Sequence, residues 1–350
     1  MNIKPILNQM IAKERLSESQ FRATFKAIFA GELSDPQIAA LLMGFETQGV
    51  TETELHLGAE IMRENMIPVD APAGSMDIVG TGGDGLTTYN ISTACTFVCA
   101  GAGQAVAKHG NRAVSSASGA SDVLSELGVK LDISTTKTEE CLAKAGVCFL
   151  FAPNHHKAMR FVGPARAAMG VRTIFNRLGP LSNPARVKHI LVGVYDDDLR
   201  KIYAKALQKL GTKSALIVHG SDGMDEITTT GPTYVSELRD GHINEYKITP
   251  VQFGMDQVTL DDLKGGDPSF NAKALKALLT GQGGPYRDIV VLNAGAALFA
   301  SGKAVSIESG IEMAQSSIDS RAALEALKTC LLYTSPSPRD RQKSRMPSSA

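Results

Sequence analysis

Apolar residues recur at helical spacing through the first 70 residues. Ile38, Leu41 and Phe45 are three or four positions apart, which is the period of an amphipathic helix. Three such stretches begin with Ser or Thr followed three positions later by Gln or Glu, the pattern of a capping box. The three pairs are Ser17 with Gln20, Ser34 with Gln37, and Thr51 with Glu54. This pattern predicts an all-helical N-terminal region, with chain turns at Gly31 and Gly49.

A Pro/Ala/Gly-rich connector, 68–75, separates this region from a different pattern and is a candidate hinge. Beyond it, short apolar runs alternate with helical stretches. The predicted strands are Asp77–Val79, Gln104–Ala107, Val147–Phe151, Ile190–Tyr195 and Ala215–Val218. The predicted helices are Ser92–Ala102, Ser121–Leu127, Thr138–Ala145 and Leu199–Leu210. Alternation of this kind predicts an α/β domain around a central, mostly parallel sheet.

The C-terminal part continues with a predicted antiparallel hairpin, Tyr234–Ile248, that turns at Gly241. A segment Asp288–Leu292 and two helices, Ala294–Phe299 and Ile307–Leu327, are expected to close the domain. Periodicity is lost from about Cys330, and the last stretch resembles translated vector sequence. The predicted organisation is a helical domain at 1–70, an α/β domain at 71–329 and a disordered tail at 330–350; a basic tail that binds nucleic acid is the alternative for the last segment.

Composition narrows the function classes. The formal net charge is zero, so no overall field favours nucleic acid or an anionic membrane. No apolar run reaches the roughly 18 residues of a membrane span, and no signal peptide is evident. The five cysteines contain no C-x-x-C pair, so buried thiols are favoured over a metal site or disulfides. These features predict a cytoplasmic protein.

The candidate chemistry lies between Asp84 and Asp122, a span that contains no other Asp or Glu. It holds Lys108, His109 and Arg112, several hydroxyl side chains, and glycines in or beside its turns. Glycine-rich turns bring backbone N–H groups close to a ligand, and hydroxyls and lysine add donors that do not repel an anion. The span therefore predicts a polyanion cradle, most simply for phosphates, where strands hand over to helices.

Two common nucleotide motifs do not explain this span. Gly80, Gly82 and Gly85 satisfy the pattern G-x-G-x-x-G after an apolar strand. A dinucleotide site also needs an acidic residue about 20 positions later to bind the ribose, and that window is free of acids. A Walker A loop is excluded because no Gly-Lys-Ser/Thr follows.

Several long motifs occur in one order along nearly the whole chain, about 1–327. They are GTGGD at Gly80–Asp84, NIST at Asn90–Thr93, KHGNRAVSS at Lys108–Ser116, GPAR at Gly163–Arg166, RTIFNRLGPLSNP at Arg172–Pro184, and the pair Asp225–Glu226. In these motifs the sequence resembles the anthranilate phosphoribosyltransferases, which share a fold with nucleoside phosphorylases. The resemblance implies transfer of the phosphoribosyl group of 5-phosphoribosyl-1-pyrophosphate to the amine of anthranilate, in tryptophan biosynthesis. It also implies a homodimer formed by the helical domain, whereas the sequence alone leaves plain packing and a partner surface both open for that domain.

The resemblance further implies roles for individual residues. The phosphoribosyl pyrophosphate site would consist of Gly80, Gly83, Asp84, Thr88, Asn90, Ile91, Ser92, Thr93, Lys108, Asn111, Arg112, Ala113, Val114, Ser115, Ser116 and Ala120. Gly80, Asn111 and Arg166 would bind anthranilate, and Ser92, Asp225 and Glu226 would bind Mg²⁺. No residue is assigned as a general acid or base, and Lys108, His109 and Asn111 would position the substrates.

Two positions depart from the family pattern, and two other functions stay open. Ala120 stands where the family often has Ser, so a contact there would use the backbone, and Ser125 stands where it often has Glu. Asp225 and Glu226 on their own would also suit a solvated acidic turn. The alternative functions are a pyrimidine nucleoside phosphorylase-like enzyme, disfavoured by the KHGNR and GPAR residues, and a non-catalytic nucleic-acid-binding relative, disfavoured by the intact motifs.

Overall fold

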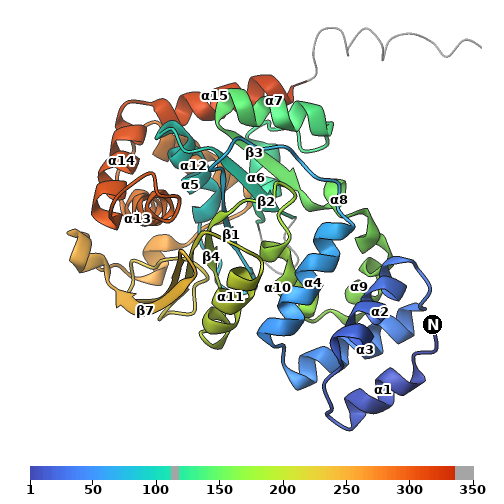
Figure 1. Ribbon diagram of the computed structural model, residues 1–350. Coiled ribbons are helices and arrows are strands. Elements are labelled where there is room, and N and C mark those ends of the chain that lie inside the picture. Colours follow the sequence, from blue (N-terminus) through green and yellow to red (C-terminus); the bar gives the residue numbers. More distant parts are fainter. Residues whose placement is uncertain (112–117, 336–350) are drawn as a thin grey trace, which may run out of the picture.

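The computed structural model describes residues 1–111 and 118–335, and it contains a helical bundle packed beside an α/β domain (Figure 1). The bundle consists of α1 (Lys4–Ile11), α2 (Glu18–Phe29), α3 (Asp35–Gln48) and α4 (Glu52–Glu64). All three predicted capping boxes are present, at the starts of α2, α3 and α4. Gly31 and Gly49 have φ of 72° and 69°, so they turn the chain where glycine is favoured.

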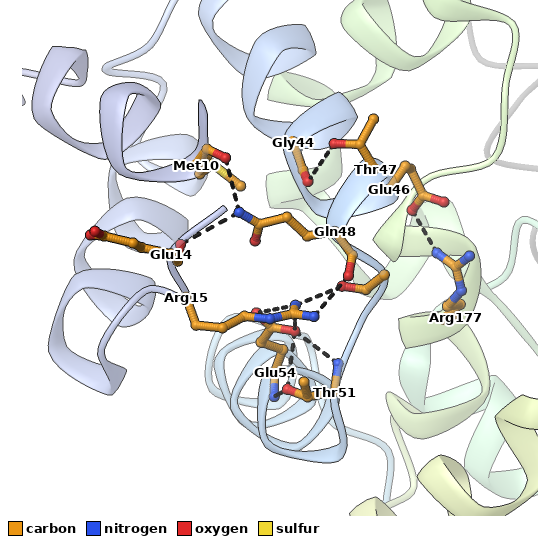
Figure 2. Close-up of polar contacts among 11 residues, drawn as sticks. Met10, Glu14, Arg15, Gly44, Glu46, Thr47, Gln48, Thr51, Glu54 and Arg177 are labelled. Carbon is orange, nitrogen blue, oxygen red and sulfur yellow. Dashed lines mark hydrogen bonds and ion pairs between the residues drawn. The ribbon is translucent and has the colours of Figure 1, made fainter. Parts of the chain in front are cut away.

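Arg15, in the loop before α2, bonds to both sides of the turn between α3 and α4 (Figure 2). Its guanidinium donates to the carbonyls of Gly49 and Gln48 at 2.7 and 2.8 Å, which are orphan acceptors at the end of α3. The same group lies 3.1 Å from Glu54, whose carboxylate accepts the Thr51 amide in the capping box of α4. One side chain thus satisfies the carbonyls at the end of α3 and pairs with the glutamate that caps α4.

The α/β domain is built on one seven-stranded sheet of order β3-β2-β1-β4-β5-β6-β7. The strands are β1 (Met76–Gly80), β2 (Val106–Gly110), β3 (Val147–Phe151), β4 (His189–Gly193), β5 (Ser214–Gly220), β6 (Thr233–Arg239) and β7 (His242–Ile248). The first five pair in parallel, while β6 and β7 form the predicted antiparallel hairpin. The prediction of a mostly parallel sheet is confirmed.

Helices cover both faces of the sheet. They are α5 (Ile91–Gly101), α6 (Ala120–Glu126), α7 (Thr135–Ala145), α8 (Ala152–His155), α9 (Gly163–Met169), α10 (Ile174–Leu178), α11 (Asp198–Lys209), α12 (Pro268–Leu279), α13 (Pro285–Ala300), α14 (Ile307–Asp319) and α15 (Ala322–Thr334), with 3₁₀ turns at Lys157–Phe161, Gly179–Leu181, Pro250–Phe253 and Leu260–Leu263. One core joins α5, α7 and α12–α15 to the sheet, and a second joins the opposite face to α10, α11 and the whole bundle. No helix in the described parts of the chain is long and apolar enough to cross a bilayer.

Four predicted boundaries are wrong. Strand β2 does not end at Ala107, because Lys108 and His109 stay in register with β3. The segment Asp288–Leu292 is not separate from the following helix, since both belong to α13, which is buried on nearly all sides and so lacks a polar stripe.

The other two concern the C-terminal end. The predicted helix Ile307–Leu327 is split into α14 and α15 where Arg321 adopts a left-handed φ of 69°. Helix α15 also continues past the predicted start of the tail, because Cys330 and Thr334 are buried.

Candidate active site

The predicted site residues gather at the carboxyl ends of the parallel strands. GTGGD starts at the last residue of β1, Lys108 lies in β2, and the acidic pair Asp225–Glu226 follows β5. Connections from β1 lead outward to β2 and β3 on one side, whereas β4 and β5 continue on the other. In open α/β sheets ligands bind where the strand order reverses in this way, so the junction of β1 and β4 is the expected binding crevice.

The glycine-rich loop after β1 is tied down residue by residue. The Thr81 amide donates to the Gly193 carbonyl at 2.9 Å, and the Gly82 amide donates to Asp225 Oδ2 at 2.6 Å. Gly82, Gly83 and Gly85 all have φ between 66° and 80°, a conformation that strains other residues. A Cβ on Gly80 would lie 2.3 Å from Asp225 Oδ2, so the carboxylate approaches because the position is glycine.

The N-terminus of α5 lies at the same junction. Asn90 is the N-cap residue, and its side chain bonds Ser118 and Asn271, which fix the entry to the helix. The Ser92 amide donates to Glu226 Oε1 at 3.0 Å. Free N–H groups and the helix dipole make such an end attractive to anions, and here a carboxylate already uses one of the donors.

Asp225 and Glu226 form an acidic pair in which Asp225 is buried and Glu226 is half-buried. Asp225 is 9% exposed, and burial followed by the nearby charge of Asp84 raises its pKa to about 7. Burial, then Asp225 and Asp84, raise the pKa of Glu226 well above its ordinary value. Carboxylates that raise each other's pKa are the donor set that a hard divalent cation stabilises, so the residues fit magnesium.

The acidic pair lacks a third side-chain ligand of its kind. Within residues 1–111 and 118–335, no three His, Cys, Asp or Glu residues are arranged to hold a metal ion. Ser92 Oγ lies near the pair and accepts from Lys108 Nζ at 3.2 Å. A cation bound here would therefore take further oxygens from a ligand or from water, as Mg²⁺ commonly does with substrate phosphates.

Lys108 is a buried residue of the site rather than a lysine at a loop. Its Nζ donates to the Ile78 carbonyl at 2.5 Å as well as to Ser92 Oγ. Burial lowers its pKa, while Asp77 favours the charged form. Asp77 accepts from Asn183 Nδ2 at 2.7 Å and from the His109 amide at 3.1 Å, and burial raises its pKa to about 6. Lys108 thus joins β1 to the start of α5, and the nearby charge of Asp77 favours its ammonium form.

His109 is held as a neutral imidazole. Its Nδ1 lies 3.0 Å from the Gly179 carbonyl, which can only accept, so Nδ1 carries the proton. Burial, followed by His156, lowers its pKa well below the ordinary value. The two rings lie 5.1 Å apart, and the Nε2 atom of each is buried with no hydrogen-bond partner within the described residues. His109 therefore keeps an unpaired acceptor nitrogen inside the protein.

Arg166 lies on α9 and is aimed by the next helix. Its Nη2 donates to Asn176 Oδ1 at 3.1 Å, and the same oxygen accepts the Thr173 amide at 3.0 Å in the capping box of α10. Gly179, which binds His109, directly follows α10. Arg166 and His109 are thus connected through one short helix.

The remaining predicted residues have more peripheral or undescribed positions. Thr88 forms an isolated bridge with Lys264, and the Asn111 carbonyl accepts from Ser121 Oγ at 3.2 Å. Ala120 begins α6, and Ser125 Oγ donates back to the Ser121 carbonyl. The predictions for Arg112, Ala113, Val114, Ser115 and Ser116 lie outside the described residues.

Sequence reasoning missed four residues that shape this site: Asp77, Asn183, Arg172 and Tyr195. Asp77 had a visible signal, since an acid inside an apolar strand needs a partner. Asn183 and Arg172 lie in the motif RTIFNRLGPLSNP, but spacing alone did not show what they contact. Tyr195 follows β4 and had no signal in the sequence.

Comparisons with known proteins agree with this geometry. Residues 4–66 match the helical bundle domain of a glycosyl transferase family, and residues 73–324 match its a/b domain. The anthranilate phosphoribosyltransferase of Parvibaculum lavamentivorans is 49% identical over 333 residues, which is 95% of this chain and 98% of that protein. The enzyme of the same name from Rhizobium meliloti is 49% identical over 327 residues, 93% of this chain and 97% of that protein.

Two solved structures extend the comparison. Anthranilate phosphoribosyltransferase from Thermus thermophilus superposes with a TM-score of 0.88 and 39% identity, over 94% of this chain and 98% of that one. The enzyme from Saccharomyces cerevisiae in complex with PRPP and Mg superposes with a TM-score of 0.85 and 27% identity, over 94% and 96% of the two chains.

Proposed function

The chain belongs to the anthranilate phosphoribosyltransferase family, and on that premise we propose that it transfers the phosphoribosyl group of 5-phosphoribosyl-1-pyrophosphate to the amine of anthranilate. The products are N-(5-phosphoribosyl)anthranilate and pyrophosphate, and the step belongs to tryptophan biosynthesis. The observation that carries the proposal is the convergence of a glycine-rich loop, a helix N-terminus and an acidic pair at the junction of β1 and β4.

The donor substrate suits the β1 and α5 side of the crevice. The amides of the loop Gly80–Asp84 and of the first turn of α5 supply hydrogen-bond donors for phosphate oxygens, with Asn90, Ile91, Ser92 and Thr93 opening the helix. Lys108 holds Ser92 in place and adds positive charge beneath the anion. Residues Thr88, Asn111 and Arg112–Ser116 with Ala120 would complete the phosphoribosyl side, as the family pattern implies.

Asp225, Glu226 and Ser92 would hold magnesium. Their fit follows from the raised pKa values of the two carboxyls and from the amides that already orient one oxygen of each. When bound, the ion would offset the negative charge of the pyrophosphate. Lys108, whose ammonium donates to the Ser92 hydroxyl, would add a second positive charge beside the pyrophosphate.

Anthranilate needs a donor for its carboxylate and a site for its amine. Arg166, aimed by Asn176, offers a planar fork that matches a carboxylate. Gly80 and Asn111 would orient the amine, and His109, whose Nε2 is buried, would shape the pocket wall beside it. The amine attacks C1 as a neutral nucleophile while the C1–O bond to pyrophosphate breaks, and the proton that the new C–N bond releases passes to the leaving pyrophosphate or to water. Catalysis would then come from positioning and electrostatics, and no general base is assigned.

We further propose a homodimer and a cytoplasmic location. Two apolar side chains of the bundle are exposed, Ile11 at 80% and Met43 at 43%. A second copy of the chain packed against the bundle would cover them. All five cysteines are free and buried, as expected of a protein from a reducing compartment.

The test is a fluorescence assay of anthranilate with the full chain. The signal should fall with time only when anthranilate, 5-phosphoribosyl-1-pyrophosphate and Mg²⁺ are all present, and omission of any one should abolish the decay. No decay from folded protein would refute the proposed reaction, and phosphorolysis of pyrimidine nucleosides and binding of single-stranded nucleic acid would then be measured in turn.

A further inference from the structure

Three consecutive residues of the glycine-rich loop are each held by a different part of the fold. Thr81 is held by β4 through Gly193, and Gly82 is held by Asp225. The Gly83 carbonyl accepts from Nη2 of Arg172, which lies between α9 and α10. The first two partners are buried and belong to the sheet end, whereas Arg172 is exposed.

Arg172 has a defined seat. Its guanidinium carbon lies 4.0 Å from the ring centroid of Tyr195, within the range of a cation–π contact. The Tyr195 amide donates to Thr81 Oγ1 at 3.2 Å. The tyrosine on which Arg172 stacks is therefore itself bonded to the start of the loop. A Cβ on Gly83 would lie 2.7 Å from Arg172 Nε, which shows that the guanidinium packs directly against the loop backbone.

The seat continues into the helical bundle. Arg177, on α10, has its guanidinium carbon 6.0 Å from the centroid of the Tyr195 ring. Its Nη1 binds Glu46 of α3 at 2.5 Å (Figure 2). Tyr195 is therefore flanked by two arginines, one reaching the loop and one reaching the bundle. Arg172 also favours the charged form of Asp84, opposing the burial that raises the pKa of this carboxyl.

We propose that Arg172 is a positioning residue that, seated on Tyr195, latches the glycine-rich loop in the conformation that receives the donor phosphates. This inference deepens the proposed function and rests on it for its kinetic consequence. A loop ordered before binding spares the ligand the cost of ordering it, so the latch would strengthen donor binding. Anthranilate, whose carboxylate is assigned to Arg166 and not to the latched residues 81–83, would be less affected.

The kinetic test compares Arg172→Ala, Arg172→Lys and Tyr195→Leu with Arg160→Ala. Arg160 is the matched control because it is an exposed arginine stacked on a ring, 4.6 Å from Phe161, away from the loop. Arg172→Ala should raise the KM for 5-phosphoribosyl-1-pyrophosphate about tenfold, with the KM for anthranilate changed less than about twofold. Tyr195→Leu should reproduce most of this rise in the donor KM, and the double variant Arg172→Ala/Tyr195→Leu should raise it little further. Arg172→Lys should give a donor KM between those of the wild type and Arg172→Ala.

A second readout does not depend on activity. Hydrogen exchange of the amides at 81–85 in the unliganded protein should be faster in Arg172→Ala than in wild type, and unchanged in Arg160→Ala. Wild-type exchange rates, or an unchanged donor KM in an active enzyme, would overturn the latch. An inactive wild-type protein whose loop exchanges faster in Arg172→Ala would instead refute the proposed reaction and leave the latch supported.

Discussion

At Arg166, one amide oxygen sets the direction of a charged side chain. Asn176 Oδ1 accepts from the guanidinium and from the first turn of α10, so the arginine points toward a wall that is fixed by a helix cap. We expect Arg166→Ala to raise the KM for anthranilate by at least about tenfold, because a bidentate carboxylate contact would be lost. The KM for the phosphoribosyl donor should stay within about twofold. Steady-state kinetics with both substrates varied test this, and an unchanged anthranilate KM would remove Arg166 from the pocket.

The acidic pair makes a prediction about metal and pH. Since the pKa of Asp225 in the metal-free protein is about 7, protons compete with a cation, and the Mg²⁺ concentration for half activity should fall as pH rises from 6 to 8. The double variant Asp225→Asn/Glu226→Gln should lose productive magnesium use. Activity titrated with Mg²⁺ at both pH values checks this, with the exposed-acid variant Asp261→Asn as control. Wild-type magnesium dependence in the double variant would refute the assignment of Asp225 and Glu226 as magnesium ligands.

His156 links stability to acid. Burial, then His155, lower its pKa to about 4, so it binds a proton mainly in the unfolded chain. Its contribution to stability is complete above about pH 6.5 and is lost as pH falls toward 4, up to about 3 kcal/mol. Denaturant titrations at pH 7, 6 and 5 should show a shallower loss of unfolding free energy in His156→Gln. The exposed control His242→Gln should keep the wild-type slope; equal slopes in all three proteins would contradict this role.

The sequence predicted the chemistry of single residues better than their contacts. Asp84, Ser92, Lys108 and the acidic pair were expected at one site, and the fold brings them to one edge of the sheet. Other contacts within the site join residues far apart in the chain: Asn183 lies 106 positions from its partner Asp77, and Arg172 lies 89 positions from its partner Gly83. Periodicity and capping patterns describe only neighbours within a few residues, so these partners had to await the fold.

At the scale of elements, β4 owes its place beside the acidic pair to one glycine. A Cβ on Gly193 would lie 1.4 Å from the Asp225 carbonyl oxygen, and β4 cannot move away because it is paired with β1 and β5. We expect Gly193→Ala to cost about 3 kcal/mol of unfolding free energy and to weaken magnesium use, since Asp225 must shift. Gly283→Ala is the control, since its Cβ would meet nothing within 4 Å and should change stability by less than about 0.5 kcal/mol. Equal stability of the two variants would contradict the close approach.

Element boundaries were predictable where local patterns act alone. The capping boxes of the bundle and the Asp240–Gly241 turn, with φ of 49° and 81°, depend on neighbouring residues, and those elements agree with expectation. Strand β2 and helix α13 were misjudged because tertiary burial overrides the local signal. Lys108 is a charged residue that remains in a strand since Ile78 and Ser92 satisfy its ammonium.

At the scale of the molecule, the bundle and the α/β domain share one core although they match separate family domains. Bundle residues such as Phe25 and Phe45 belong to the same buried cluster as Ile190 and Ile217 of the sheet. The connector between the two regions is also fixed, because the Ile67 amide donates to the His155 carbonyl and the Val69 amide to the Pro184 carbonyl. A continuous core predicts that both parts unfold together.

The ion pair between Glu46 and Arg177 crosses this shared interface and tests that view. The pair is 16% and 13% exposed, so Glu46→Gln leaves a largely buried guanidinium without its acid and should cost about 2 kcal/mol. If the core couples the two parts, denaturant unfolding should shift to lower concentration but stay a single transition by every probe. Glu325→Gln, which removes an exposed pair with Lys328, should change little. A separate early transition of the bundle in Glu46→Gln would show that this ion pair, rather than the shared core, fixes the bundle beside the active site.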